Sequence, residues 1–371
     1  MRARVAFVVE SGTDVRLIEG LAERFALSAV LRPISGGSAI SRAPRCSFEV
    51  VEGPESRLGF ARFAFSYLRR AQPDVTLVQG YGTAALAAHL ARPSRNIFML
   101  VCSPVEDYYV CRREHPDPGR PYRVWELAGQ RALARLNARF GANYVVLSEH
   151  LAGVVRAHGA RHVAVVPVYG VDTGIFRPSS ESRAELRRRR GLPATGSIIF
   201  FSSRIAPEKD TETLLGAFAR LLAQGFDVWL LNRSGGHARL IEAARAAGVA
   251  NRLVATDAVH PHGELPLDYQ AADLCVQASR EEGLGFSPLE ALACEVPVVA
   301  AATGGLLETI RDGETGWTYP VGDAAALARA MAEALHDPAE AARRARTGRA
   351  LVLARFDRKL VFDRLEQVLL G

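Results

Sequence analysis

Residues 274–290 read LCVQASREEGLGFSPLE and decide how the surrounding chain folds. The run opens with the apolar stretch Leu274–Gln277, which has the length and composition of a short buried strand. Gly283 and Gly285 follow, and glycine lets the backbone turn sharply and approach a ligand closely. The run ends on the pattern of a helix start. A strand, a glycine-containing loop and a helix in this order form the unit from which parallel α/β sheets are built.

The helix start is predicted from the residues after the second glycine. Ser287 has the side chain of an N-cap, Pro288 suits the first helical position, and Glu290 stands at the third position of a capping box. The N–H groups and positive dipole end of such a helix favour a diphosphate. Taken alone, Glu290 is a structural cap and Glu282 is a solvated surface acid. Together, beside two glycines and directly after a strand, they favour a ligand site.

The same alternation extends over the chain of 371 residues, a length that suits two α/β domains. Short apolar runs alternate with helical patterns such as 15–25 and 126–140, and this pattern restarts after residue 180. We expect an N-terminal domain at 1–175, a C-terminal domain at 176–350 and a helix within 351–371 that could pack back on the first domain. The segment 341–370 is predicted to be long and helical. The predicted strands are Val5–Val9, Val75–Val78, Ile97–Val101, Tyr144–Leu147, Val163–Val166, Gly196–Ser202, Asp227–Leu231, Leu253–Ala255, Leu274–Gln277 and Val296–Ala300.

A second loop carries two cations. Ligands of open parallel sheets bind beyond the carboxyl ends of the strands, and the loop 203–210 follows the predicted strand 196–202. Arg204 and Lys209 in this loop could stabilise the negative charge that grows on a leaving diphosphate. The chain has no Asp-x-Asp pair of the sort that holds a metal there, so we expect no metal and no cofactor. The alternative is two surface cations, with Glu208 and Lys209 as a solvated pair.

The stretch around Glu282 and Glu290, which are separated by seven residues, resembles the glutamate–seven–glutamate motif of the retaining glycosyltransferases of family 4. The resemblance implies the GT-B fold, in which two Rossmann-like domains with parallel sheets face a central cleft. It implies a metal-independent, retaining transfer of a sugar from a nucleotide-diphosphate donor to an acceptor hydroxyl. In it, Glu282 contacts the sugar and Glu290 the ribose. The implied catalytic residues are Arg204, Lys209 and Glu282, and the implied donor contacts are Gly283, Leu284, Gly285, Phe286, Ser287 and Glu290.

Weaker matches follow the family's order, mainly over residues 140–340. Residues 167–178 resemble the family's linker motif, with Tyr169 in place of the usual asparagine. Val259 and His260 stand where the family's chain passes the nucleotide base. Gly12 lies in a loop after the first strand, where the family's glycine loop meets the donor phosphates. An ordinary strand-to-helix turn is an equal alternative for Gly12.

The loop after the predicted strand 97–101 departs from the family. Members often carry a histidine there, near the transferred sugar, whereas this chain reads CSPVEDYY at 102–109. Ser103, Glu106 and Asp107 are therefore the candidates for the acceptor side. A glycan, a lipid-linked molecule and a small molecule all stay open as the acceptor.

The distribution of charge and of cysteines indicates which partners and which cellular compartment the protein could have. Residues 1–180 hold 23 arginines against 15 acids, although the whole chain has a net charge of only +6. This basic half could attract a phosphorylated substrate or an anionic membrane, or it could only aid solubility. The basic, apolar stretch 58–70 could lie on a membrane, although packing on its own sheet is favoured, and the cluster 187–190 is predicted to be a solvated helix face. Five scattered cysteines and the absence of a long apolar run favour a cytoplasmic bacterial protein, with peripheral contact at the plasma membrane as an option and no nucleic-acid partner.

Two other functions stay open at this point. One is another GT-B enzyme, either a nucleotide-sugar epimerase or a phosphorylase. A phosphorylase of that fold needs a lysine-bound cofactor, and the chain has only Lys209 and Lys359. The other is a non-catalytic subunit that binds a nucleotide sugar beside an active transferase, which the departure at 102–109 leaves open.

Overall fold

The computed structural model describes residues 2–34, 40, 46–91, 96–116, 123–141, 143–233, 237–255 and 263–371. The chain forms two compact units. Unit 1 comprises Met1–Glu106, Arg123–Gly170 and Arg358–Gly371, and unit 2 comprises Asp107–Tyr122 and Val171–Asp357. Whether the ranges 1–175, 176–350 and 351–371 fold as independent domains stays a prediction.

Unit 1 is built on a parallel sheet that has seven strands within the described residues, in the order β3-β2-β1-β4-β5-β6-β7. The central strands are buried on both faces because helices cover both sides of a parallel sheet. The sequence prediction missed β2 and β3, and β3 is a largely exposed strand that reads EVVE, without the apolar run of a buried strand. The strands are β1 (Arg4–Val9), β2 (Ala26–Leu31), β3 (Glu49–Glu52), β4 (Val75–Gln79), β5 (Ile97–Val101), β6 (Asn143–Val146) and β7 (His162–Val165).

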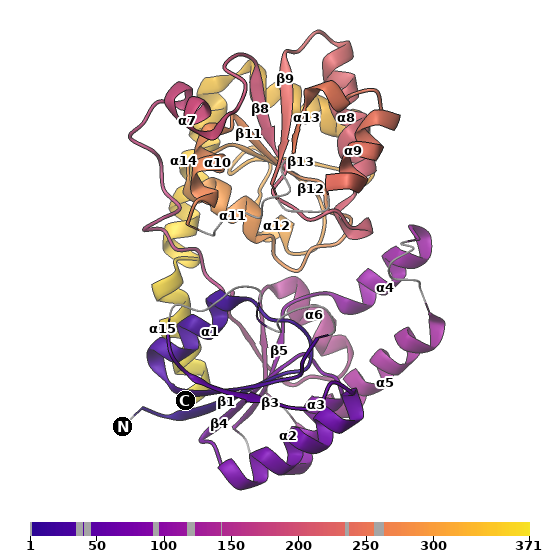
Figure 1. Cartoon of the computed structure of the whole chain (residues 1–371), viewed down its shortest axis with the longest axis vertical. Coiled ribbons are helices and arrows are strands. Elements are labelled where there is room, and N and C mark those ends of the chain that lie inside the picture. Colours follow the sequence, from indigo (N-terminus) through magenta and orange to yellow (C-terminus); the bar gives the residue numbers. More distant parts are fainter. Residues whose placement is uncertain are drawn as a thin grey trace. The chain divides into compact units, whose positions relative to one another are not determined.

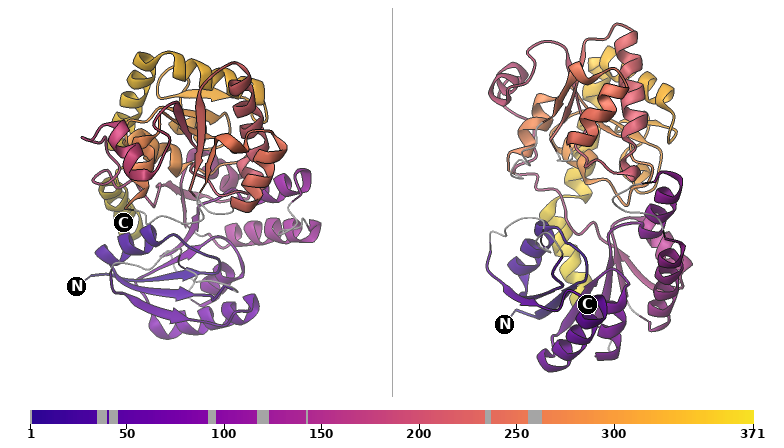
Figure 2. Two further views of the ribbon diagram at one scale, coloured as in Figure 1. Left: turned by 45° about the horizontal axis from the view of Figure 1, so that its top comes forward. Right: turned by 45° about the vertical axis from the view of Figure 1, so that its right-hand side comes forward.

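Helices cover the unit 1 sheet, with α2 and α3 side by side on one face (Figure 1). Helix α2 buries Phe60, Ala64 and Leu68 and leaves Leu58 exposed, as expected for an amphipathic helix on its sheet. Helix α15 lies beside α1 (Figure 2). The side chain of Arg24 in α1 pairs there with Asp363 in α15. The helices are α1 (Val15–Arg24), α2 (Arg57–Ala71), α3 (Thr83–Ala91), α4 (Val105–Glu114), α5 (Val124–Arg139), α6 (Glu149–Ala157) and α15 (Arg358–Leu370).

Membrane contact of the stretch 58–70 stays a prediction. No helix in the described part of the chain is both long and apolar enough to cross a membrane.

Unit 2 repeats the design on a parallel sheet with six strands among the described residues, in the order β10-β9-β8-β11-β12-β13. Side chains such as Ile199, Leu230 and Val276 are fully buried and form its core with the covering helices. The strands are β8 (Ser197–Phe200), β9 (Val228–Asn232), β10 (Leu253–Ala255), β11 (Leu274–Gln277), β12 (Val298–Ala301) and β13 (Trp317–Tyr319). The prediction of parallel α/β architecture is confirmed in both units.

The helices of unit 2 lie on both faces of its sheet. Helices α8, α9 and α13 pack on one face, and α10, α11 and α14 on the other (Figure 1). They are α7 (Arg183–Arg190), α8 (Thr211–Ala223), α9 (His237–Ala246), α10 (Leu265–Ala271), α11 (Phe286–Ala293), α12 (Leu306–Thr309), α13 (Ala324–His336) and α14 (Pro338–Arg355).

The segment 341–370 is helical, as predicted, and a break at Phe356 and Asp357 divides it between α14 and α15. The carbonyl of Phe356 accepts a hydrogen bond of 2.7 Å from the N–H of Val171. The carboxylate of Asp357 accepts one of 2.5 Å from the hydroxyl of Thr173. These contacts with a distant segment replace the helical hydrogen bonds at the break.

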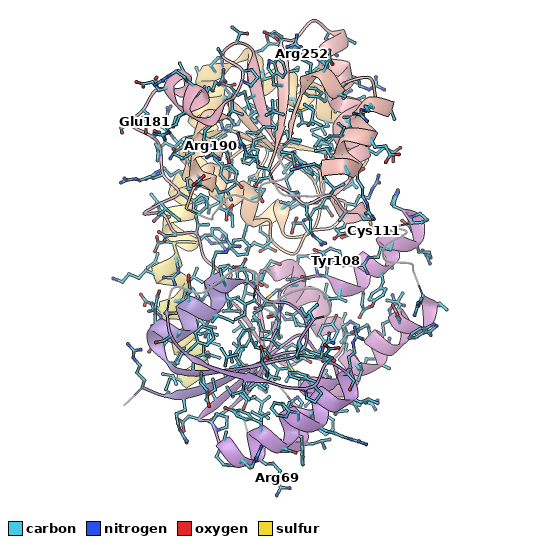
Figure 3. The ribbon with its side chains drawn as sticks, in the orientation of Figure 1. Arg69, Tyr108, Cys111, Glu181, Arg190 and Arg252 are labelled. Carbon is cyan, nitrogen blue, oxygen red and sulfur yellow. The ribbon has the colours of Figure 1, made fainter. Side chains whose placement is uncertain are left out.

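The prediction of a solvated cluster at 187–190 is also wrong for two of its arginines. Arg190, which lies inside unit 2 (Figure 3), donates two hydrogen bonds of 2.9 Å to the fully buried carboxylate of Asp268. Arg187 is buried and pairs with Asp273. A guanidinium can bind a carboxylate through two parallel hydrogen bonds. Arg187 and Arg190 therefore attach α7 to the segment that contains Asp268 and Asp273, and they do not face water.

Candidate functional site

Two loops meet at the carboxyl edge of the unit 2 sheet because β8 and β11 are neighbours in it. The loop after β8 contains the short 3-10 turn Pro207–Lys209, and the loop after β11 contains Glu282. The Nζ atom of Lys209 lies 2.6 Å from Oε2 of Glu282. Their side chains are only 12% and 13% exposed. The structure thus brings together two residues that lie 73 positions apart in the sequence.

Further polar side chains hold the carboxylate of Glu282. Its Oε2 atom also accepts hydrogen bonds of 3.1 Å from Nε2 of Gln277 and from Oγ of Ser279. Gln277 is buried, and its Oε1 accepts a hydrogen bond from Ser203. Sequence reasoning did not name Gln277 or Ser279, although a glutamine that ends an apolar strand was a usable signal. These donors fix the position of the Glu282 carboxylate.

Arg204 lies in the same loop as Lys209 and has a different environment. Its side chain is half exposed and pairs with the buried carboxylate of Glu208. The alternative of Glu208 and Lys209 as a solvated pair is therefore wrong, since Glu208 is only 1% exposed and holds Arg204. The exposed part of the Arg204 guanidinium can reach an anionic ligand at this edge.

The start of α11 differs from the predicted capping box. Helix α11 begins at Phe286, and its N-cap is Gly285 with φ of 90°, in the left-handed region that favours glycine. The hydroxyl of Ser287 donates to the carbonyl of Ser202 at 2.9 Å. The carboxylate of Glu290 binds a different helix. The predicted capping box is wrong because the N-cap is Gly285 and the side chains of Ser287 and Glu290 take partners distant in sequence.

Glycines bring the loop before α11 against the loop before α12. A Cβ atom on Gly285 would lie 2.4 Å from Cδ2 of Leu306. A Cβ atom on Gly305 would lie 2.2 Å from the carbonyl oxygen of Gly283. The N–H of Gly305 donates to the carbonyl of Glu282 at 3.0 Å. Neither glycine has room for a side chain, so the path of the backbone around Glu282 depends on both.

Glu290 is held inside unit 2. It is only 4% exposed, and its Oε2 atom accepts a hydrogen bond of 3.0 Å from the hydroxyl of the fully buried Tyr269. Burial, and then the charge of Glu290, raise the pKa of Tyr269 well above its ordinary value. Tyr269 therefore stays a hydrogen-bond donor and fixes the orientation of Glu290.

Glu281, which directly precedes Glu282, has a raised pKa. It is half buried, and this desolvation raises its pKa to about 7, with smaller contributions from Asp107 and Glu114. Asp107 and Glu114 belong to the part of α4 that forms part of unit 2. Asp107, one of the acceptor-side candidates, therefore acts on the loop that carries Glu282.

Tyr108 and Cys111, two further side chains of α4 (Figure 3), have raised pKa values. Burial, and then the charges of Glu282 and Glu208, raise the pKa of Tyr108. Burial raises the pKa of Cys111 to about 11. Both side chains are therefore neutral near pH 7. Sequence reasoning did not single out either residue.

The other acceptor-side candidates and Gly12 belong to unit 1. The carbonyl of the exposed Gly12 accepts a hydrogen bond of 3.0 Å from Gln79. Ser103 is partly buried in the loop after β5. Glu106 is buried and binds Nε2 of His158 at 2.6 Å and Nε of Arg131 at 2.9 Å. Glu106 thus has an ion-pairing role within unit 1.

The predicted base contacts Val259 and His260 lie outside the described residues. Within the described ranges, no group of three or more His, Cys, Asp or Glu side chains is arranged to hold a metal ion.

A known protein family matches part of unit 2. Residues 182–351 match the family model described as glycosyl transferases group 1. A GDP-mannose-dependent alpha-(1-6)-phosphatidylinositol monomannoside mannosyltransferase of Mycolicibacterium smegmatis is 35% identical over 211 residues, 54% of this chain and 55% of the relative. A D-inositol 3-phosphate glycosyltransferase of Thermobispora bispora is 34% identical over 230 residues, 59% of this chain and 53% of the relative. The chain spans about half the length of these curated relatives.

Solved structures share the fold over nearly the whole chain. Sucrose-phosphate synthase from Thermosynechococcus elongatus superimposes with a TM-score of 0.81 and 22% identity, covering 99% of this chain and 98% of that one. Anabaena HepE, solved in complex with UDP-glucose, gives a TM-score of 0.74 and 18% identity and covers 99% of each chain. At such identities the likeness shows the fold alone. The matched residues 182–351 contain Arg204, Lys209, Glu282 and Glu290, so this part of the chain resembles the group 1 glycosyl transferases.

Proposed function

We propose that this protein is a glycosyltransferase that moves a sugar from a nucleotide-diphosphate donor to an acceptor hydroxyl. The contact between Lys209 and Glu282 carries the proposal, because it places a cation and a carboxylate at the strand edge where α/β sheets bind ligands. The match of residues 182–351 to the group 1 family model supports it. One relative is named as GDP-mannose-dependent, and HepE was solved with UDP-glucose, which favours a nucleotide sugar as donor.

The proposed catalytic step is departure of the nucleoside diphosphate. Negative charge grows on the diphosphate as its bond to the sugar breaks. Lys209, the exposed side of Arg204 and the N-terminal end of α11 supply fixed positive charge for it. We propose that these groups suffice without a bound metal ion.

Glu282 and Glu290 are proposed to bind the donor. Carboxylates are strong acceptors for sugar hydroxyls. Glu282 is assigned to the transferred sugar and Glu290 to the ribose, following their resemblance to the family 4 motif. Tyr269 supports the second role because it fixes the Glu290 carboxylate before any ligand arrives. The backbone of 283–287 is proposed to approach the diphosphate.

The finer points of the proposal rest on the resemblance to family 4. Retention at the anomeric carbon is inferred from it, and no side chain is assigned as a nucleophile. Gly12 is proposed to meet the donor phosphates, Val259 and His260 the base, and Ser103, Glu106 or Asp107 the acceptor. We further propose that the protein acts in the cytoplasm.

The test compares two double variants with the same loss of charge. Arg204→Ala with Lys209→Ala removes the proposed cations, and Arg188→Ala with Lys359→Ala removes an exposed arginine and an exposed lysine elsewhere. Release of nucleoside diphosphate from UDP-glucose, GDP-mannose and ADP-glucose is measured, with glycerol and inositol phosphate as trial acceptors. We expect the first variant to lose at least about 100-fold in kcat and the second to match wild type.

Three outcomes decide the proposal. Equal turnover of both folded double variants would sink the assigned role of the cations. Tight binding of a donor without turnover would point to a non-catalytic subunit. Loss of activity in excess EDTA, restored by Mg²⁺ or Mn²⁺, would refute metal independence. The anomeric proton coupling of the product, read by NMR, tests retention.

A further inference from the structure

An ion pair joins the two site loops beside the Lys209–Glu282 contact. Nη2 of Arg280 lies 2.6 Å from Oδ1 of Asp210. The Asp210 side chain is fully buried, and that of Arg280 is 19% exposed. Asp210 directly follows Lys209, and Arg280 stands two residues before Glu282. This pair therefore connects the loop that carries the cation with the loop that carries the carboxylate.

The backbone at Asp210 needs support. Its backbone φ is 47°, in the left-handed region that residues other than glycine seldom adopt. The carboxylate of Asp210 caps α8, since its oxygens accept hydrogen bonds from the N–H of Thr213 at 3.2 Å and from its hydroxyl at 2.7 Å. One buried carboxylate thus holds the first turn of α8 and the guanidinium of Arg280 together.

The backbone of Arg280 joins the same network. Its N–H donates to the carbonyl of Glu208 at 2.9 Å, within the turn that ends at Lys209. Its carbonyl accepts a hydrogen bond of 3.0 Å from the hydroxyl of Thr303, which follows β12. Arg280 therefore contacts the residues on both sides of Lys209 in the chain.

We propose that Arg280 is a positioning residue that holds Lys209 through Asp210 and never touches the donor. The inference rests on the proposed function, in which the Lys209 ammonium must meet charge that develops on a leaving diphosphate. A misplacement of about 1 Å can cost roughly 100-fold in rate. Without the ion pair, the left-handed turn at Asp210 loses a constraint, and Lys209 samples positions away from Glu282.

The experiment uses the full chain. Its control variant changes an ion pair at the amino ends of β8 and β11, away from the site loops at their carboxyl ends. Arg280→Met breaks the pair, and Arg280→Lys is the conservative rescue. Asp210→Asn keeps an acceptor for the α8 cap and tolerates the left-handed turn, so it serves if Arg280→Met fails to fold. The control is Arg187→Met, because Arg187 pairs with Asp273, whose Oδ2 also accepts the N–H of Ile198 at the start of β8.

Each variant is measured with the donor that wild type turns over. We expect Arg280→Met and Asp210→Asn to lower kcat at least tenfold, which is about 1.4 kcal/mol of lost transition-state stabilisation, with the donor KM changed less than threefold. The kcat of Arg280→Lys should be at least threefold higher than that of Arg280→Met. Arg187→Met should unfold at lower urea and keep kcat within twofold of wild type. Equal kcat losses in Arg280→Met and Arg187→Met would reduce Arg280 to a stabilising residue.

A second readout does not need turnover. The chain has only two lysines, so labelling with [¹⁵N]lysine gives two backbone amide signals in the NMR spectrum, one from Lys209 and one from Lys359. Arg280→Met should shift the Lys209 signal and raise the Kd for UDP or GDP, read from that signal, at least tenfold. Arg187→Met should leave both signals in place. An unmoved Lys209 signal in Arg280→Met overturns the positioning role even if wild type is active. Absence of turnover in wild type with a moved signal overturns the proposed function alone.

Discussion

Two buried tyrosines of unit 2 give a matched test of how Glu290 is held. Tyr269 is fully buried and donates a hydrogen bond of 3.0 Å to the Glu290 carboxylate. Tyr319 is 2% exposed, and its hydroxyl has no hydrogen-bond partner among the described residues. Replacing each by phenylalanine removes one oxygen and keeps the ring. A hydrogen bond to a charged group contributes about 1.5–3 kcal/mol. We therefore expect Tyr269→Phe to lower the free energy of unfolding by about that amount.

The second substitution should behave in the opposite way. A buried hydroxyl without a partner costs about 1–3 kcal/mol of desolvation, so Tyr319→Phe should be neutral or stabilising. The ring contacts of Tyr269 with Phe176 and Phe200, at centroid distances of 6.1 and 4.9 Å, survive in Tyr269→Phe and do not confuse the comparison.

Urea unfolding followed by tryptophan fluorescence measures both variants, because Trp229 and Trp317 lie in strands of unit 2. The same proteins are titrated with the donor. Tyr269→Phe should weaken donor binding about fivefold or more, equivalent to about 1 kcal/mol, because Glu290 gains orientational freedom. Equal unfolding free energies for the two variants would show that the Tyr269–Glu290 hydrogen bond does not stabilise unit 2, and the assigned preorganisation of Glu290 would fail with it.

The remaining predictions concern Glu281 and two glycines. The pKa of Glu281 is raised to about 7, so the folded state binds this proton more tightly than the unfolded chain does. The free energy of unfolding should therefore fall as the pH rises from about 4.5 to 7, and it should level off above pH 7. Glu281→Gln should therefore raise the urea midpoint at pH 8 and leave it nearly unchanged at pH 4.5; a midpoint difference independent of pH would contradict the raised pKa. Gly305→Ala should destabilise unit 2 by about 1–3 kcal/mol and lower donor turnover, because its Cβ would meet the carbonyl of Gly283 at 2.2 Å. Gly129→Ala is its control, since it sits in α5 with nothing within 4 Å of the added Cβ and should stabilise by about 0.5–1 kcal/mol; equal effects of the two substitutions in urea unfolding would refute the steric argument.

Local pattern was enough to predict the architecture and the places where chemistry could occur. Apolar runs such as Ile97–Val101 and Leu274–Gln277 proved to be buried strands, because a strand covered on both faces must be apolar along its length. Residues that directly follow such strands necessarily stand at the carboxyl edge of the sheet. This reasoning alone singled out Arg204, Lys209 and Glu282.

Only the tertiary structure decided which side chains meet. The Lys209–Glu282 and Tyr269–Glu290 contacts join residues 73 and 21 positions apart, and no local spacing rule reaches that far. The same reason explains the errors. The spacing of Ser287 and Glu290 fits a capping box. Instead, Ser287 donates to the carbonyl of Ser202, and Glu290 accepts from the buried Tyr269. The cluster of Arg187 and Arg190 was predicted to be solvated. Carboxylates from a distant segment, Asp273 and Asp268, pair with these guanidinium groups and compensate for their burial. Sequence thus sets the secondary structure and the edge of the sheet at which a residue stands, and packing between distant segments sets its partner.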